Sequence, residues 1–195
     1  WNNDFYGGDL KGIENSLEYL KSLGVDILYL SPIVQSQSNH RYDAADYEVV
    51  DPYAGNNEDL KSLCEKAHEL DMKVILDAVF NHTGNDSKYF NEYGTYPELG
   101  AYQSIDSKYS PFYRKHYNNG HIEYEYWWGM KNLPECDGNA QEWIDYITGV
   151  GGIIDKWFAL GIDGLRLDVA DELTDNFISL IRKAVKRNKN DGFII

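Results

Sequence analysis

The chain has 195 residues, and its 32 acidic side chains outnumber 18 basic ones, which gives a formal net charge of −14. A chain of this length can bury a hydrophobic core and is typical of one domain or slightly more. A surface this acidic repels phosphate backbones, so we expect no nucleic-acid partner. No apolar run is long enough to cross a bilayer, so we expect no membrane-spanning segment.

The two cysteines, Cys64 and Cys136, form neither a metal-ligand spacing nor a disulfide framework. Cys64 lies on the apolar stripe of an expected helix and is most simply a core residue. Trp1 is followed directly by polar sequence, so we expect no signal peptide in this chain. The sequence leaves the cellular compartment open.

The first part of the chain predicts two helices and two strands. Apolar residues at helical spacing predict a first helix over residues 10–20, which Gly24 ends. The apolar run 25–33 then predicts a strand that is buried on both faces. A second helix with one apolar stripe is expected from Asn57, and it leads to a second buried strand over residues 73–80.

The alternation of predicted helices and strands stops in the middle of the chain and then resumes. Residues 83–139 are rich in Tyr, Asn, Gly and Ser, and they are too many for an ordinary loop, so we interpret them as an inserted irregular subdomain. Beyond them the pattern predicts a helix around 143–160, a strand over 163–169 and a helix around 175–186. Residues 192–195 resemble the start of a further strand.

Alternating helices and buried parallel strands are typical of an α/β fold. Candidate functional residues at the carboxyl ends of several strands favour a (β/α)₈ TIM barrel, but about four strands are expected where a closed barrel needs eight. The prediction is therefore a partial barrel: a segment at 1–82, the inserted subdomain at 83–139 after the strand that ends near Phe80, and a second segment at 140–195. Exposed strand edges near 25–33 and at the end of the chain predict a homo-oligomer that covers them.

The clearest chemical signal lies in residues 164–170. In a strand, alternate residues point to the same side, so Arg166 and Asp168 are expected on one face. A guanidinium beside a carboxylate keeps it ionised and oriented, as a nucleophilic aspartate requires. Taken alone, the segment fits an ordinary ion pair at a strand end equally well.

Three strand ends carry motifs that resemble a known family. Residues 40–47 read HRYDAADY, residues 77–82 read DAVFNH, and residues 164–172 begin GLRLD. The last two segments are similar to the D-x-V-x-N-H and G-x-R-x-D signatures of the α-amylase superfamily of retaining glycoside hydrolases, and residues 131–134 resemble its short L-P motif. The ordered set, which runs over residues 7–195, is far more specific than any one motif.

The resemblance implies roles for five residues. Asp168 would be the nucleophile that attacks the anomeric carbon, and Arg166 would orient it. Tyr42 would stack against the sugar ring, His82 would hydrogen-bond its hydroxyls, and Asp77 would tie Arg166 and His82 in place. A carboxylate below the ring and an aromatic face beside it suit an oxocarbenium-like transition state.

Single residues of this set carry little weight alone. A histidine after an asparagine is more often a turn residue than a ligand-binding one. Tyr42 is one of 16 tyrosines. The aromatic run 109–128 is expected mainly to pack the inserted subdomain, with one or two side chains reaching the cleft.

The residues after Asp168 indicate a subgroup. Residues 169–172 read VADE and resemble the V-A-N-E stretch of neopullulanases, cyclomaltodextrinases and maltogenic amylases. This resemblance places Glu172 beside the leaving-group subsites. Asp171 replaces the asparagine of that group, so its role stays open.

A structural calcium is the one cofactor that the resemblance suggests, and none is implied for catalysis. Residues 5–10 read FYGGDL and resemble the same subgroup, in which positions matching Gly7, through its carbonyl, and Asp9 help to bind calcium. The other ligands would lie before Trp1, so the site would be incomplete in this chain. Asn81 matches a calcium ligand of true α-amylases.

The resulting hypothesis is a catalytic-domain fragment of a retaining α-glucan hydrolase. It would cleave α-1,4 bonds, with α-1,6 bonds left open, through a covalent glycosyl-Asp168 intermediate. A retaining mechanism needs a second carboxyl group about 5–5.5 Å away, and the family's acid would follow Ile195, so we expect the chain alone to be inactive. The expected partner is an α-glucan oligosaccharide. The alternatives are a transglycosylase of the same superfamily and a non-catalytic carbohydrate-binding relative.

Overall fold

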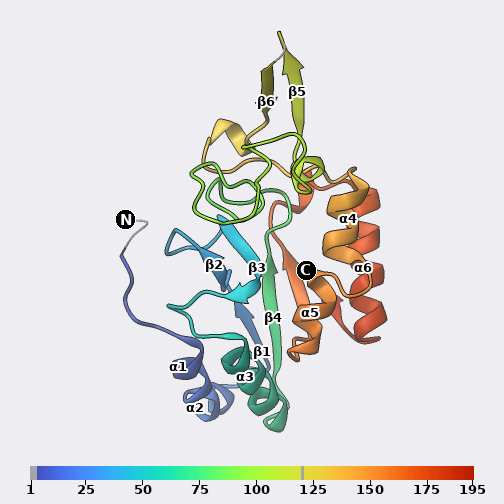
Figure 1. The fold of residues 1–195 in the computed structure, drawn as a ribbon. Helices are drawn as coiled ribbons and strands as arrows, with labels where there is room; N and C mark the ends of the chain where they lie inside the picture. The colour runs from blue at the N-terminus through green and yellow to red at the C-terminus, as the bar shows by residue number, and fades with distance from the viewer. Residues whose placement is uncertain (1–3, 120) are drawn as a thin grey trace.

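The computed structural model describes residues 4–119 and 121–195, and within them a four-stranded parallel sheet lies at the centre (Figure 1). Its strands are, in spatial order, β1 (Ile27–Leu30), β4 (Lys73–Ala78), β7 (Gly164–Leu167) and β8 (Phe193–Ile194). Every neighbouring pair is parallel, so all four carboxyl ends lie at the same edge of the sheet. The predicted α/β organisation with a parallel sheet is confirmed.

Six helices cover the sheet in the described residues: α1 (Leu10–Glu14), α2 (Leu17–Ser22), α3 (Asn57–Glu69), α4 (Gln141–Thr148), α5 (Ile153–Ala159) and α6 (Asp175–Asn188). Helices α1 and α3 pack together near β1 and β4, and α4, α5 and α6 pack against one another beside β7 and β8 (Figure 1). Helix α3 begins with a capping box between Asn56 and Asp59. Its buried stripe includes Cys64, as expected.

Two helices that were predicted as continuous are each split in two. The first is divided between α1 and α2, where the Ser16 hydroxyl bonds the carbonyl of Gly12 at 2.8 Å and Ser16 becomes the N-cap of α2. The second is divided between α4 and α5 by glycines. A Cβ at Gly149 would lie 2.4 Å from the Asp145 carbonyl oxygen, and Gly151 has a φ of +77°. These backbone positions require glycine, so helical periodicity alone could not locate the breaks.

The prediction that the first strand is buried on both faces is wrong. Leu28 and Leu30 of β1 are buried, whereas Ile27 and Tyr29 are each 46% exposed. Within the described residues, only the face that carries Leu28 and Leu30 is covered. The sequence patterns did not predict a second sheet, in which β2 (Val34–Ser36) and β3 (Ala44–Val50) form an antiparallel pair with an irregular register. The homo-oligomer that would cover the edge of β1 stays a prediction.

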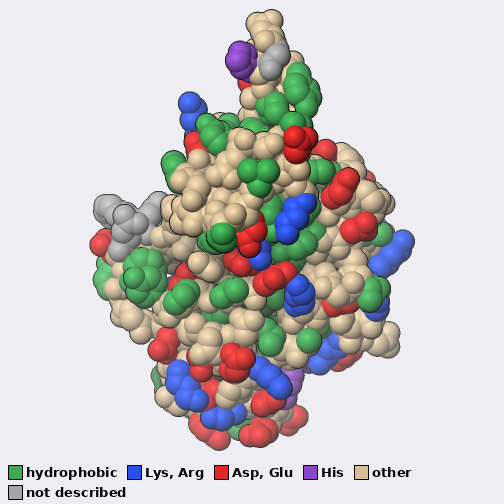
Figure 2. Space-filling model, in the orientation of Figure 1, with side chains coloured by type: hydrophobic (Ala, Val, Ile, Leu, Met, Phe, Trp, Pro, Cys, Tyr) green, Lys and Arg blue, Asp and Glu red, His purple; other side chains and the backbone are tan. Residues whose placement is uncertain are grey.

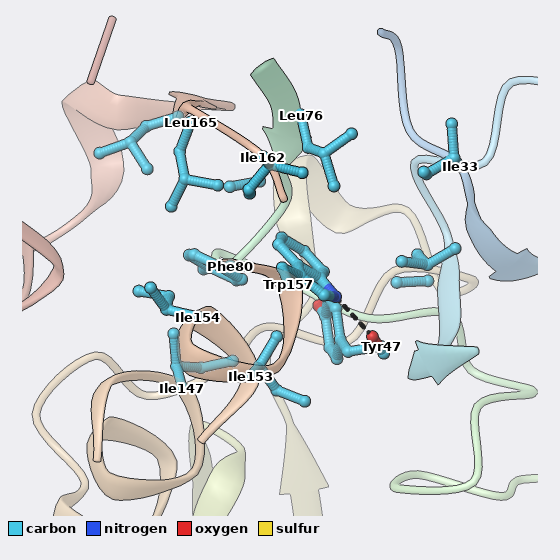
Figure 3. Close-up of a cluster of buried hydrophobic side chains, with 14 of the residues drawn as sticks. Ile33, Tyr47, Leu76, Phe80, Ile147, Ile153, Ile154, Trp157, Ile162 and Leu165 are labelled. Carbon is cyan, nitrogen blue, oxygen red and sulfur yellow. Dashed lines mark hydrogen bonds between the residues drawn. The ribbon is translucent and has the colours of Figure 1, made fainter. Parts of the chain in front are cut away.

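An aromatic cluster of Tyr47, Phe80 and Trp157 joins β3, the segment that follows β4, and α5 (Figure 3). Trp157 stacks on Phe80 at 5.8 Å, and its indole nitrogen donates to the Tyr47 carbonyl at 2.8 Å. The Tyr47 hydroxyl in turn donates to the carbonyls of Val79 at 2.6 Å and His82 at 3.1 Å. This buried phenol therefore fixes the backbone that follows β4, where the candidate residues lie.

Residues 83–119 and 121–139 form an irregular layer above the sheet. They contain a hairpin of β5 (Lys115–Asn118) and β6 (His121–Tyr124), which projects at the top of Figure 1, and the short 3₁₀ helices η1 (Ser110–Phe112) and η2 (Trp127–Gly129). Buried aromatic side chains such as Tyr89, Phe90 and Tyr113 pack this layer. The domain boundaries that were predicted around it stay a prediction.

Charged side chains gather at the lower end of the molecule, over α2 and α3, in the view of Figure 2. Acidic and basic groups are mixed there, and several form ion pairs, such as that between Lys21 and Asp26 at 3.0 Å. Within the described parts of the chain, no helix combines the length and the apolar character needed to span a membrane.

The close approach of β7 and β8 yields a stability prediction. A Cβ at Gly164 would lie 2.4 Å from the Phe193 carbonyl oxygen and 3.2 Å from Ile75. We expect Gly164→Ala to lower the free energy of unfolding by about 1–3 kcal/mol, as overpacking usually does. Gly8→Ala is the matched control, because nothing lies within 4 Å of that position. Urea denaturation measures both, and equal stabilities would contradict the prediction.

Candidate active site

One guanidinium nitrogen joins two carboxylates at the carboxyl ends of β4 and β7. Asp77 and Arg166 are register partners, so their side chains leave the sheet side by side. The Nη1 of Arg166 donates to both Asp77 carboxylate oxygens, at 3.0 and 3.1 Å, and to Oδ1 of Asp168 at 2.6 Å. The backbone N–H of Asp168 donates to the Ala78 carbonyl at 3.1 Å and so extends the strand pairing by one residue. The expected juxtaposition of Arg166 and Asp168 is therefore present.

Asp77 is a buried acceptor for three different side chains. Besides Arg166, the hydroxyls of Tyr29 and Tyr42 donate to its Oδ2 at 2.5 and 2.9 Å. A carboxylate bound in this way holds its neighbours in position. The expectation that Asp77 also ties His82 is wrong, because neither ring nitrogen of His82 has a hydrogen-bond partner among the described residues.

Tyr29 was missed by the sequence reasoning. Its hydroxyl reaches Asp77 because the side chain lies on the same face of the sheet as Asp77 and Arg166. The apolar run 25–33 concealed this residue among core positions. Strand alternation between Leu28 and Leu30 would have been the signal that Tyr29 points the other way.

Asp168 is half-buried, and its environment exerts opposing effects on its pKa. Burial raises the pKa, the hydrogen bond from Arg166 lowers it, and the charge of Asp77 raises it again, so the net shift is upward. For Arg166, burial opposes the charged form, but the bonds to Asp77 and Asp168 raise its pKa further. The arginine therefore stays charged, while Asp168 protonates more readily than an exposed aspartate.

A cavity of about 460 Å³ lies beside Asp168. It is lined by Tyr42, His82 and Asp168, together with Trp127, Met130 and Leu133. Asp168 is the one carboxylate among the described residues that line it. The structure thus brings together three of the residues expected to meet the sugar. A cavity of this size suits a small molecule or a short segment of a larger one.

His82 lines this cavity, and both of its ring nitrogens are buried without a hydrogen-bond partner among the described residues. Its ring stacks on Trp127 with the centroids 5.2 Å apart, and the side chain is almost fully buried. Burial lowers its pKa to about 4, and the nearby backbone of Tyr42 opposes this shift without reaching hydrogen-bond geometry. The imidazole is therefore neutral near pH 7, and its one donor and one acceptor have no partner among the described residues. The Trp127 indole N–H is also buried without a partner.

The backbone directly after Asp168 is strained. Val169 has φ 50° and ψ 40°, a left-handed conformation that is rare for a β-branched residue. Such a conformation costs about 1–3 kcal/mol and is most often found at functional sites. It turns the chain abruptly from β7 into the 3₁₀ helix η3 (Ala170–Glu172).

The remaining predicted residues lie outside this cavity. The Glu172 carboxylate accepts a hydrogen bond from the Trp128 indole at 2.9 Å. Asp9 caps α1 by accepting from the Gly12 N–H at 2.6 Å, and Gly7 has a φ of +80°. No cluster of three or more His, Cys, Asp or Glu side chains suited to a metal is found in the described part of the chain. Calcium binding by Gly7 and Asp9 stays a proposal, as does that by Asn81, whose amide nitrogen is buried without a partner.

Comparison with known proteins identifies the family. The model of the "Alpha amylase, catalytic domain" family matches residues 2–191. The chain belongs to the alpha-amylase family. The predicted superfamily and the (β/α)₈-type fold of its catalytic domain are thereby confirmed, with this chain forming part of the barrel.

Relatives are found among several enzymes of this family. The chain is 41% identical to an amylopullulanase of Thermoanaerobacterium saccharolyticum, over 100% of this chain and 16% of that protein. It is 36% identical to neopullulanase 2 of Thermoactinomyces vulgaris, over 99% of this chain and 32% of the relative. Members of the predicted subgroup are therefore found among the relatives, and amylopullulanases are found there too. The chain spans only a sixth to a third of the length of these relatives.

Solved structures show the same fold. The cyclic alpha-maltosyl-(1→6)-maltose hydrolase of Arthrobacter globiformis in complex with maltose superposes with a TM-score of 0.85 at 30% identity, over 99% of this chain and 43% of that chain. A debranching enzyme of Nostoc punctiforme gives a TM-score of 0.82 at 34% identity, over 98% and 39% of the two chains.

The environment of His82 yields a prediction about its protonation. We expect its ring resonances in an NMR titration to stay unchanged from pH 8 to about 5 and to shift near pH 4. Because the folded state favours the neutral ring, the unfolded chain binds the proton first as the pH falls below 6.5. His82 therefore lowers the free energy of unfolding progressively between pH 6.5 and about 4. The resonance absent from His82→Gln identifies this residue, and a midpoint at or above pH 6.5 would contradict the prediction.

Proposed function

We propose that this chain is part of the catalytic domain of an α-glucan hydrolase in which Asp168 is the nucleophile. The observation that carries the proposal is the 2.6 Å bond from Arg166 to Asp168 at a cavity that contains no other carboxylate among its described lining residues. Family membership and relatives named for the hydrolysis of pullulan and cyclomaltodextrins support the same activity.

We infer a retaining mechanism from membership of the alpha-amylase family, with Asp168 as its nucleophile. Arg166 holds Oδ1 of Asp168, so Oδ2 is the oxygen that would attack the anomeric carbon and form a glycosyl ester. The leaving oxygen would take a proton from a carboxylic acid on the other side of the bond, and water would then hydrolyse the ester with the help of the same group. No described residue of the cavity wall other than Asp168 carries a carboxyl group. We therefore propose that these 195 residues alone do not turn over substrate.

Three further groups have roles in this proposal. The ring of Tyr42 would lie against the sugar, while its hydroxyl is held by Asp77. The free ring nitrogens of His82 would bond sugar hydroxyls as neutral donor and acceptor. Tyr29 acts through Asp77 and Arg166 on the nucleophile and is a positioning residue.

Substrate and assembly form the finer part of the proposal. Relatives named for pullulan and for a cyclic (1→6)-linked maltose dimer favour α-glucans that contain α-1,4 and α-1,6 bonds. A transglycosylase would use the same groups, and analysis of the products separates the two activities. A homo-oligomer stays part of the proposal, and the exposed Ile27 of the edge strand β1 supports it.

Removal of the nucleophile tests the proposed function. We expect Asp168→Asn in the full-length protein to lower kcat on pullulan or β-cyclodextrin by about a thousandfold or more, as the loss of a nucleophile or its activating partner does. Asp171→Asn is the matched control, because Asp171 is exposed on η3 and lies outside the cavity wall. Turnover by Asp168→Asn within tenfold of the parent rate would refute the proposal.

The hydroxyl of Tyr29 yields a second kinetic prediction. Tyr29→Phe removes one hydrogen-bond donor from Asp77, so Arg166 is held less firmly. The arginine then lowers the pKa of Asp168 less effectively. We expect kcat/KM to fall about tenfold, the usual effect of losing a hydrogen bond to a charged group, and the acid limb of its pH profile to move to higher pH. Tyr19→Phe, at an exposed tyrosine of α2, is the control. An unchanged rate and an unchanged acid limb would contradict this role.

A further inference from the structure

A short antiparallel ladder places Glu135, from the irregular layer above the sheet, directly opposite His82. The segments 81–83 and 134–136 are joined by two backbone hydrogen bonds, of 3.2 and 2.9 Å, one on each side of this pair. In an antiparallel pair of this type, the two side chains leave the same face with their Cβ atoms about 4.5–5.5 Å apart. A glutamate side chain can span that distance, so a rotation of its own bonds would bring the Glu135 carboxylate to the imidazole.

The Glu135 carboxylate is nevertheless directed away from His82. Its Oε2 accepts a hydrogen bond from Nη1 of Arg114 at 3.2 Å. Both ring nitrogens of His82 lack a partner among the described residues. His82 lines the cavity, whereas Glu135 is not among the described residues of its wall. The ion pair therefore coincides with the absence of a second carboxylate from that wall.

Arg114 is fixed to the same ladder through its backbone. Its N–H donates to the Glu135 carbonyl at 3.0 Å, and its own carbonyl accepts from the Glu125 N–H at 3.0 Å. Burial raises the pKa of the Glu135 carboxyl, the guanidinium opposes this rise, and the charges of Glu125 and Glu172 add to it. Without the arginine, two neighbouring carboxylates would repel Glu135 and leave it without its cation.

We propose that Arg114 is a positioning residue that holds the Glu135 carboxylate away from His82, so that both ring nitrogens of the histidine remain open to a ligand in the cavity. A carboxylate bonded to the imidazole would occupy one nitrogen and favour the protonated ring, which has no acceptor. The inference rests on the proposed function, in which His82 bonds sugar hydroxyls. It assigns a role in that site to an arginine that is not among the described residues of the cavity wall.

A double-mutant cycle in the full-length protein distinguishes this role from that of an ordinary ion pair. We expect Arg114→Gln to lower kcat/KM on pullulan about tenfold, because Glu135 then bonds His82. Arg114→Lys, which keeps the cation, should lower it less than threefold. Glu135→Ala should stay within twofold of the parent, and the double variant Arg114→Gln/Glu135→Ala should recover to within threefold. Arg182→Gln, at an exposed arginine of α6, is the matched control.

A crystal structure of the full-length Arg114→Gln variant gives a second, independent readout. We expect a carboxylate oxygen of Glu135 within about 2.7–3.2 Å of a ring nitrogen of His82, the distance of an ordinary hydrogen bond. A Glu135 side chain that turns to solvent, or that keeps its direction in the parent protein, would contradict the proposal.

Two kinetic results also overturn the inference. Equal losses in Arg114→Gln and Glu135→Ala, without recovery in the double variant, would mean that the ion pair only ties the ladder together. An unchanged rate in Arg114→Gln would show that His82 does not depend on the arginine. If Arg114→Gln does not fold, the double variant decides alone, and it must fold and work within threefold of the parent rate. Failure of the proposed function is seen separately, as turnover that survives Asp168→Asn.

Discussion

The ion pair between Arg166 and Asp168 depends on a second carboxylate that does not reach the cavity wall. Asp77 receives Arg166 Nη1 through both of its oxygens, so the guanidinium is already fixed before it contacts Asp168 at 2.6 Å. Two tyrosine hydroxyls complete the shell of Asp77. Because burial raises the pKa of Asp168, this fixed cation is what favours its ionised form.

The fold places these groups through backbone features far from any ligand. Parallel pairing sets Asp77 opposite Arg166, and Gly164 allows β8 to lie close against β7. The buried Tyr47 hydroxyl holds the carbonyls of Val79 and His82, which orients the loop that carries the histidine. The β-branched Val169 and the bulky Trp128 adopt left-handed backbone conformations, the first at the exit from β7 and the second in the layer above the sheet. The pattern fits a site whose geometry the core determines.

Sequence patterns predicted the order of elements and the meeting of Arg166 with Asp168, because strand alternation and motif order are local properties. The patterns failed at the helix breaks and where tertiary contacts decide. The breaks near Ser16 and Gly149 depend on local backbone bonds and close approaches that periodicity does not register. Tyr29 was hidden inside an apolar run, and only the neighbouring strand shows that its hydroxyl reaches Asp77. The bond between Trp128 and Glu172 joins residues 44 apart, which no motif encodes.

Covalent trapping of the nucleophile measures directly whether Asp168 forms a glycosyl ester. The full-length protein is incubated with 5-fluoro-α-D-glucosyl fluoride, digested, and mapped by mass spectrometry. We expect one fluoroglucosyl ester per active site, located on Asp168 and absent from Asp168→Asn. A label on another carboxylate, or turnover of this reagent without any ester on Asp168, would contradict it.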